Sequence, residues 1–376
     1  MFHLRTGLVA TAALAAVTGF ACPAFASTAL AQGPFGGAVF VQTDNTAGNQ
    51  VVAYQRAADG TLTQAGTYPT GGLGGVLAGS VVDHLASQGS LQYDALHSLL
   101  FAVNAGSDTV SVFSVQGDRL ALRQVVASGG SFPVSIALRG NLLYVLNALN
   151  GGSVQGYRLF GDHLLPLPGS SRALGLDPTE TPQFTSTPGQ VAFTPDGTQL
   201  IVTTKNNGND IDVFNVGAGG WLSQSPVVNA EPGTVPFGIA YDTSGDLVIA
   251  EAGPDALETF SVASDGTVTA IDMLNNAQAA TCWVAAAGPF LYAGNAGSAS
   301  ETGYTSASGQ LTLISDTDTD AGTVDAAATP GGQFLYVQTG AAGIVDEFSV
   351  GAGGMLTSLG SVTVPDAVGG EGIVAS

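Results

Sequence analysis

The segment PGQVAFTPDGTQLIVTTKNN (residues 188–207) contains two short apolar strands joined by Pro195-Asp196-Gly197. Such a turn is typical of a β-hairpin. The second strand ends in a small polar residue, Thr204, which we call an anchor. An apolar strand that ends in a polar or acidic anchor occurs seven times along the chain, at Thr43, Asn104, Asn147, Thr204, Glu251, Asn295 and Thr339.

Each anchor strand has further apolar segments around it. An aromatic residue lies nine to eleven positions after every anchor, and an aliphatic residue follows seven or eight positions later. Another strand precedes most anchors, as in PVSIAL (133–138) and PFGIAY (236–241). Four short antiparallel strands repeated in this way are typical of propeller blades. The sequence therefore predicts an all-β, seven-bladed β-propeller with four-stranded antiparallel blades.

The two chain ends complement each other. EGIVAS (371–376) has the form of the first strand of a blade, but no anchor strand follows it. Residues 38–43 form an anchor strand that no first strand precedes. Pairing the C-terminal strand with the N-terminal strands would close the ring and leave no exposed sheet edge. We expect residues 32–376 to form a single propeller domain.

The N-terminus resembles a secretory signal peptide. MFHLRTG carries one Arg, and the apolar run LVATAALAAVTGFA that follows is too short to span a bilayer. We expect residues 1–31 to be the signal peptide, with cleavage after Ala26 or Ala31, and the mature protein to be secreted into the extracellular space or the periplasm. Cleavage removes Cys22 and leaves Cys282 without a disulfide partner in the chain.

The chain is strongly acidic, with 8 Lys and Arg against 29 Asp and Glu and a net charge of −21. This charge repels nucleic acids and anionic lipid surfaces. We therefore expect no nucleic-acid partner and no membrane span, and a monomer that takes a small-molecule ligand. The scarcity of basic residues also argues against phosphorylated substrates, since Lys205 is the only lysine.

The hairpin geometry predicts where a ligand site would lie. The start of the first strand and the end of the anchor strand emerge on the same face of a blade, near the central channel. We expect this channel mouth to contain a substrate-binding set made of Gln190, Asn104, Asn147, Asn295, Asp325 and Trp283.

The repeats resemble the lactonase-like seven-bladed propellers, a group that includes a 6-phosphogluconolactonase and a carboxymuconate-cyclising enzyme of fungi. The resemblance rests on PVSIAL, LYVLNA, residues 188–207 and LYAGNAG, and it covers nearly the whole mature chain. It implies lactone chemistry at the mouth. Members of the family carry Pro-Arg-His where this chain has Pro188-Gly189-Gln190, and Asn-Glu where it has Thr204-Lys205. The family's histidine, arginine and glutamate therefore do not carry over at these positions.

Two functional hypotheses follow. In the first, the protein hydrolyses a neutral or weakly charged lactone. Glu251 acts as general base, and Lys205 and the anchor amides polarise the carbonyl oxygen. In the second, the propeller is a non-catalytic extracellular binding or scaffold module. The polar anchors then hydrogen-bond to backbone and hold neighbouring blades in register.

Several other residues each have a structural alternative to a functional role. Cys282 is a candidate nucleophile or a small buried thiol, Trp283 a ligand-stacking ring or a core residue, and His84 a mouth residue or a solvated loop residue. Asp316, Asp318 and Asp320 resemble a calcium loop, although the bidentate acid of such a loop is missing, and a solvated acidic loop is the alternative. The chain has no glycine-rich phosphate cradle, HExxH or GxSxG motif, so we expect no cofactor and no metal.

Overall fold

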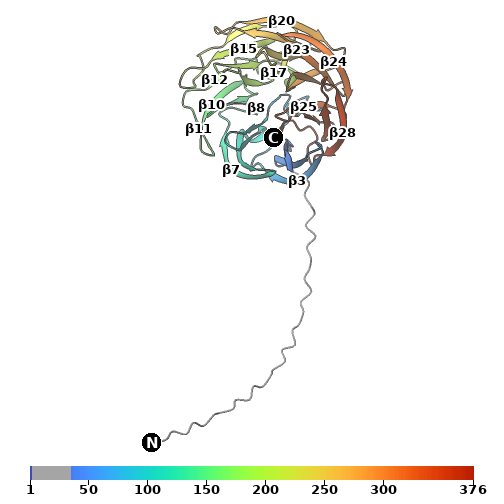
Figure 1. Cartoon of the computed structure of the whole chain (residues 1–376). Coiled ribbons are helices and arrows are strands. Elements are labelled where there is room, and N and C mark those ends of the chain that lie inside the picture. The colour runs from blue at the N-terminus through green and yellow to red at the C-terminus, as the bar shows by residue number, and fades with distance from the viewer. Residues whose placement is uncertain (2–34) are drawn as a thin grey trace. The chain divides into compact units, whose positions relative to one another are not determined.

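The computed structural model describes Met1 and residues 35–376, so the expected signal peptide and its cleavage sites lie outside the described residues. Seven antiparallel sheets surround a common centre (Figure 1). Strands such as β8, β17 and β25 lie near that centre, and strands such as β3, β20 and β28 form the rim. The predicted all-β, seven-bladed propeller is confirmed. Among the described residues, no helix has the length and apolarity needed to cross a membrane.

The strands follow the chain blade by blade, from the innermost strand to the outermost. The first blade contains β29 (Ile373–Ala375), β1 (Phe35–Gln42), β2 (Gln50–Ala57) and β3 (Leu62–Pro69). The second contains β4 (Leu91–Asp94), β5 (Leu99–Asn104), β6 (Thr109–Gln116) and β7 (Arg119–Ala127), with a 3-10 turn η1 (Ala105–Ser107). The third contains β8 (Pro133–Arg139), β9 (Leu142–Asn147), β10 (Ser153–Phe160) and β11 (His163–Pro166), and β12 (Arg172–Ala173) also pairs with β10.

The remaining blades repeat this order. The fourth follows η2 (Gln183–Thr185) and contains β13 (Val191–Phe193), β14 (Gln199–Thr203), β15 (Asp210–Asn215) and β16 (Val227–Ala230). The fifth contains β17 (Pro236–Tyr241), β18 (Leu247–Glu251), β19 (Ala256–Val262) and β20 (Val268–Asn275). The sixth contains β21 (Thr281–Ala287), β22 (Phe290–Asn295), β23 (Ser300–Ala307) and β24 (Gln310–Asp318). The seventh contains β25 (Thr323–Ala328), β26 (Phe334–Thr339), β27 (Ile344–Val350) and β28 (Leu356–Thr363).

The ring closes as predicted. β29 pairs antiparallel with β1, with Phe40 opposite Val374 and Val41 opposite Ile373. At the end of the chain, the Ser376 hydroxyl accepts a hydrogen bond from the Ala38 amide (2.9 Å). The first blade is thus assembled from both ends of the folded chain, which leaves no unpaired inner strand in the ring.

The core lies between neighbouring blades. The aromatic residue of each third strand is almost completely buried, and these residues are Tyr54, Phe113, Tyr157, Phe214, Phe260, Tyr304 and Phe348. Tyr304, for example, packs in one cluster with Leu257 of the preceding blade and Leu291 of its own. Burying one such side chain contributes about 1.5–3 kcal/mol, so the repeated aromatic position binds each blade to the next.

The outer strand of the fourth blade differs from the sequence expectation. The repeat pattern predicts that Leu222, eight positions after the aromatic Phe214, lies in this strand, but Leu222 forms only an isolated bridge with Val216, and β16 begins later at Val227. The Arg172 guanidinium donates to the Leu222 carbonyl (2.7 Å) and to the Ser223 carbonyl (2.8 Å). A side chain of the third blade therefore holds the segment that precedes β16.

The centre of the ring is crossed by residues 81–90, which we call the plug loop. The Ser87 hydroxyl donates to the Val134 carbonyl at β8 (2.9 Å). Toward the sixth blade, Gln88 donates from Nε2 to the Val284 carbonyl of β21 (2.7 Å) and accepts from the Val284 amide at Oε1 (3.0 Å). These inner-strand groups have no further strand to pair with, so the plug loop supplies their hydrogen-bond partners.

Candidate functional site

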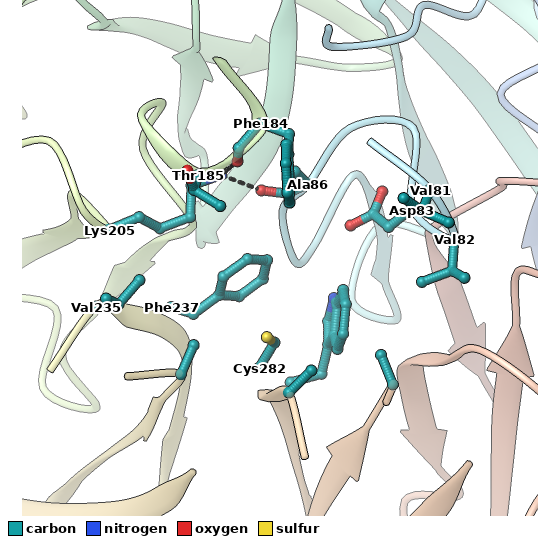
Figure 2. Close-up of a pocket in the computed structure, with 14 residues that line it drawn as sticks. Val81, Val82, Asp83, Ala86, Phe184, Thr185, Lys205, Val235, Phe237 and Cys282 are labelled. Atoms are coloured by element: carbon teal, nitrogen blue, oxygen red, sulfur yellow. Dashed lines mark hydrogen bonds between the residues drawn. The ribbon is translucent and has the colours of Figure 1, made fainter. Parts of the chain in front are cut away.

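A cavity of about 170 Å³ lies between the plug loop and the mouth ends of the fourth, fifth and sixth blades (Figure 2). Its walls come from the plug loop, from the loop around Phe184, and from the residues that begin β17 and β21. Lys205 and Trp283, two of the residues proposed from the sequence, line the cavity, as does Cys282. These three residues are far apart in the sequence and meet because the blades deliver them to one mouth.

A β-bulge explains why two consecutive residues of β21 face the same cavity. Thr281 pairs with Asn295 and Trp283 with Gly294, so Cys282 is an extra residue in the strand. Side chains normally alternate between the two faces of a strand, and a bulge breaks this alternation. Similar irregularities occur at the mouth ends of β8, β17 and β25.

Lys205 follows β14 with a left-handed backbone conformation (φ 54°) and is 1% exposed. Its Nζ donates to the carbonyl oxygens of Ala86 (2.5 Å) and Phe184 (2.6 Å), bonds that Figure 2 shows, and to the Thr187 hydroxyl (3.1 Å). All three N–H donors of the ammonium are therefore used. Burial lowers the pKa of Lys205 to about 7, although Asp83 opposes the shift. Lys205 thus ties the plug loop to the loop around Phe184.

Asp83 of the plug loop is the one carboxylate in the cavity wall, and the sequence analysis did not single it out. Its Oδ1 accepts from the Leu85 amide (2.8 Å) and its Oδ2 from the Ser87 amide (2.9 Å). Burial raises the pKa of Asp83 to about 7, while these amides and the charge of Lys205 lower it. A carboxylate with this pKa exchanges a proton near neutral pH, as a general base does.

Aromatic rings form one wall of the cavity. The rings of Phe237 and Trp283 meet edge to face, with centroids 5.1 Å apart, and Lys205 Nζ lies 5.1 Å from the Phe237 centroid. Trp283 Nε1 donates to the Ser87 carbonyl (2.8 Å), so this ring also fixes the plug loop. Gly238 leaves room for the side chain of Gln88 beside Trp283, because a Cβ there would lie 2.3 Å from Gln88 Oε1.

Glu251, the base proposed from the sequence, is fully buried at the end of β18. Its chain neighbour Ala252 lines the cavity, whereas Glu251 does not. Neither of its carboxylate oxygens has a hydrogen-bond partner among the described residues, since the nearby Thr234 hydroxyl donates to the Glu231 carbonyl (2.9 Å). Burial raises the pKa of Glu251 to about 8, and the charges of Glu258 and Glu231 add to the shift.

The three asparagine anchors hold the loops between blades. Asn295 Oδ1 accepts from Thr281 Oγ1 (2.7 Å) and Asn276 Nδ2 (2.9 Å), and its Nδ2 donates to Thr302 Oγ1 (2.9 Å). Asn104 donates to Ser111 Oγ (2.8 Å). Asn147 donates more weakly to the Ser128 carbonyl (3.4 Å). All three asparagines are fully buried, and none lines the cavity.

Gln190 and Asp325 also lie outside the cavity lining. Gln190 Oε1 accepts from the Ile239 amide of the next blade (2.5 Å). Asp325 is 4% exposed and accepts from the Ala326 amide (2.9 Å). Burial raises the pKa of Asp325 to about 6, and it lies beside Glu371, whose pKa burial and neighbouring carboxyls also raise. Glu371 Oε1 accepts from the Gly89 amide (2.9 Å), so this pair supports the plug loop.

The other residues singled out from the sequence are His84, Cys282 and the acidic run. His84 belongs to the plug loop, and its amide donates to the Gly369 carbonyl (2.8 Å). Burial raises the pKa of Cys282 to about 12, which keeps the thiol protonated. The acidic run on and after β24 is exposed, and Asp316 accepts from Thr302 and Gln278. Within residues 35–376, no group of three metal-ligating side chains is close enough to hold a metal ion.

The sequence analysis missed Asp83, Val235 and Phe237 as cavity residues. Phe237 directly follows the Pro236 of a quoted strand, so its place at a mouth was available from the pattern. Asp83 adjoins His84, which marked the long loop, but no periodicity shows that this loop turns into the channel.

The lactonase, 7-bladed beta-propeller family model matches residues 76–369. No curated protein sequence matches the chain. The fold resembles that of the periplasmic gluconolactonase of Pseudomonas aeruginosa, at 19% identity and a TM-score of 0.68, over 90% of this chain and 98% of the other. It also resembles a candidate 6-phosphogluconolactonase of Bacteroides fragilis, at 19% identity and a TM-score of 0.70, over 90% and 97%. Virginiamycin B lyase of Staphylococcus aureus is more distant, at 11% identity and a TM-score of 0.54, over 76% and 88%. The chain belongs to the lactonase family of seven-bladed β-propellers.

Proposed function

We propose that this protein is a lactonase-like enzyme that hydrolyses a small, neutral or weakly charged lactone in the cavity beside the plug loop. The observation that carries the proposal is the position of Asp83, a carboxylate in the wall of an otherwise mainly apolar cavity. Family membership supports the reaction class. The pKa of Asp83, raised to about 7, supports its role as base.

In this proposal, Asp83 takes a proton from a water molecule whose oxygen attacks the lactone carbonyl carbon. The ring C–O bond then breaks, the leaving oxygen takes up the proton that Asp83 accepted from the water, and the product is a hydroxy acid. Lys205 also lines the cavity, but its three N–H groups are bonded to protein, so it contributes a positive field rather than a direct hydrogen bond. Glu251, the base inferred from the sequence, remains the competing assignment.

A titration of released acid tests the proposal with a panel of lactones and two variants. Asp83→Asn should lower kcat/KM by at least about 100-fold, and Glu251→Gln should leave it nearly unchanged. In the wild type, kcat/KM should pass through a maximum near pH 7, because Asp83 must be ionised to act as base and Lys205, whose pKa burial lowers to about 7, must keep its charge. Loss of activity in Glu251→Gln alone would return the role of base to Glu251.

The second candidate function is a non-catalytic ligand-binding module, and one observation favours it. The N–H donors of Lys205 and Trp283 are bonded to protein, so neither directly stabilises a developing oxyanion. Failure of the folded protein to release acid from every lactone of the panel would favour this function.

We also propose that the protein is exported and works as a monomer. The signal-like N-terminus supports export, as does the similar fold of a periplasmic gluconolactonase. N-terminal sequencing of protein recovered outside the cytoplasm should begin after Ala26 or Ala31, and light scattering should give the mass of one chain. An uncleaved N-terminus or a dimer mass would contradict these points.

A further inference from the structure

We infer that the ligand of this cavity is a lactone with an alkyl or aryl substituent rather than a phosphorylated or polyhydroxylated sugar lactone. The inference rests on the proposed function for the lactone ring and on the cavity itself for the substituent. It concerns what binds, so binding tests it separately from turnover.

The cavity lining is mostly hydrocarbon. Ten of the fourteen lining residues are Ala, Val, Phe or Trp, and the edge-to-face pair of Phe237 and Trp283 forms one wall (Figure 2). Such a surface gains free energy from apolar groups and forfeits the hydration of hydroxyl groups that it does not hydrogen-bond.

The polar groups of the wall are already engaged with protein. Lys205 gives its three donors to Ala86, Phe184 and Thr187, and Trp283 Nε1 donates to Ser87. The Thr185 hydroxyl donates to the Pro182 carbonyl (3.1 Å). A phosphate would need several of these donors, and a sugar lactone would need both donors and acceptors.

The charge of the cavity lining also disfavours a phosphorylated ligand. Asp83 is the only carboxylate of the lining, and Lys205 is its only basic residue. The whole chain carries a net charge of −21. A phosphate dianion entering this cavity would therefore meet a carboxylate and lose its hydration without gaining a new cationic partner.

The size and opening of the cavity define the ligand further. Its volume of about 170 Å³ is close to that of apolar cavities of about 150 Å³ that hold benzene, so a lactone ring fits with a short substituent. Val81 lines the cavity and is also 78% exposed, which continues the apolar surface outwards. A longer alkyl chain would leave the cavity along Val81.

Fluorescence of Trp283 provides a binding assay that does not depend on hydrolysis. The chain has two tryptophans, and Trp221 is 44% exposed, so Trp221→Phe leaves the cavity ring as the only tryptophan signal. The probes are γ-butyrolactone, its γ-alkyl derivatives of increasing length, glucono-δ-lactone and 6-phosphoglucono-δ-lactone. Affinity should rise roughly fourfold per added methylene, equivalent to about 0.8 kcal/mol, until the chain emerges at Val81.

An engineered cation provides the matched test. Ala252→Arg places a guanidinium in the half-buried cavity wall, and Ala58→Arg places the same charge in an exposed turn of the first blade. The phosphorylated lactone should gain affinity in Ala252→Arg and not in Ala58→Arg.

These experiments test the ligand class and the proposed hydrolysis separately. Alkyl-lactone binding without acid release would support the ligand class and refute the proposed hydrolysis. Tighter binding of the sugar or phosphorylated lactone than of the alkyl series by the wild type would overturn the inference. So would the absence of binding by any lactone to the folded protein, a result that does not depend on the folding of either arginine variant.

Discussion

Gln88 joins the two sides of the channel, and its replacement measures how much the plug loop stabilises the ring. Gln88→Leu keeps the size of the side chain but removes both hydrogen bonds to the backbone of Val284. Gln88 is 7% exposed, so the Val284 amide and carbonyl would be left without partners in a buried site. Each unsatisfied buried group costs about 1–3 kcal/mol, and the added apolar contacts of Leu offset part of this, so we expect a loss of about 2–4 kcal/mol.

The chain offers a matched control with the same chemistry. Gln124 donates from Nε2 to the Leu164 carbonyl (3.1 Å) and accepts from the Leu164 amide (2.7 Å), but it lies half-buried between β7 and β11 at the rim. Leu164 is itself 1% exposed, but Gln124 is half-buried at the rim, so water reaches the freed groups more easily there and Gln124→Leu should cost less than Gln88→Leu.

Guanidinium unfolding followed by far-UV circular dichroism gives both values, provided that the slope of the transition is unchanged. Equal losses in Gln88→Leu and Gln124→Leu would refute the argument that burial in the channel sets the cost.

Three further predictions concern packing, titration and the anchors. Gly238→Ala should lower stability by about 1–3 kcal/mol, because its Cβ would lie 2.3 Å from Gln88 Oε1 and 2.8 Å from the Cys282 carbonyl; thermal unfolding with and without Gln88→Ala should show partial rescue in the double variant. The melting temperature should fall as pH rises from about 4 to 8, because burial raises the pKa of Asp44 to about 8 and of Asp325 to about 6. Over this range the folded chain keeps protons that the unfolded chain releases, which costs up to about 1.4 kcal/mol of stability per pH unit for each group. Asp44→Asn should make the melting temperature less dependent on pH. Asn295→Leu should lower stability by about 2 kcal/mol or more, since its buried partners Thr281, Asn276 and Thr302 lose hydrogen bonds, and an unchanged denaturation midpoint would contradict this role.

The seven-bladed ring could be predicted from the sequence because its signals are local and repeated. Each blade can be recognised from the alternation of its strands and from one aromatic position, as at Tyr304 and Phe348. Each chain end lacks the strand that the other end supplies. The late start of β16 could not be predicted, because the pattern around Leu222 does not show that the guanidinium of Arg172 from the neighbouring blade holds this segment.

The candidate site was predicted only in part. Lys205 and Trp283 lie in the cavity, since the end of an anchor strand and the start of an inner strand meet at the mouth. The asparagine anchors instead lie outside the cavity lining, where Asn295 accepts from Asn276 and Asn147 donates to Ser128, both in loops between blades, and pattern alone does not distinguish these two placements. Asp83 was not predicted, because its position depends on how a loop without periodicity crosses the ring. This loop is held by contacts with residues more than 100 positions away, such as the hydrogen bond from Lys205 to Ala86.

The central claim is that the cavity between the plug loop and β21 is the ligand site. A crystal structure of the protein with an alkyl-substituted cyclopentanone, which resembles a lactone but cannot be hydrolysed, tests this claim most directly. We expect the ring of the ketone to lie against Phe237 and Trp283, its carbonyl group on the side of Asp83, and its alkyl chain along Val81. A ketone bound at another place on the propeller, with the cavity empty, would contradict the account.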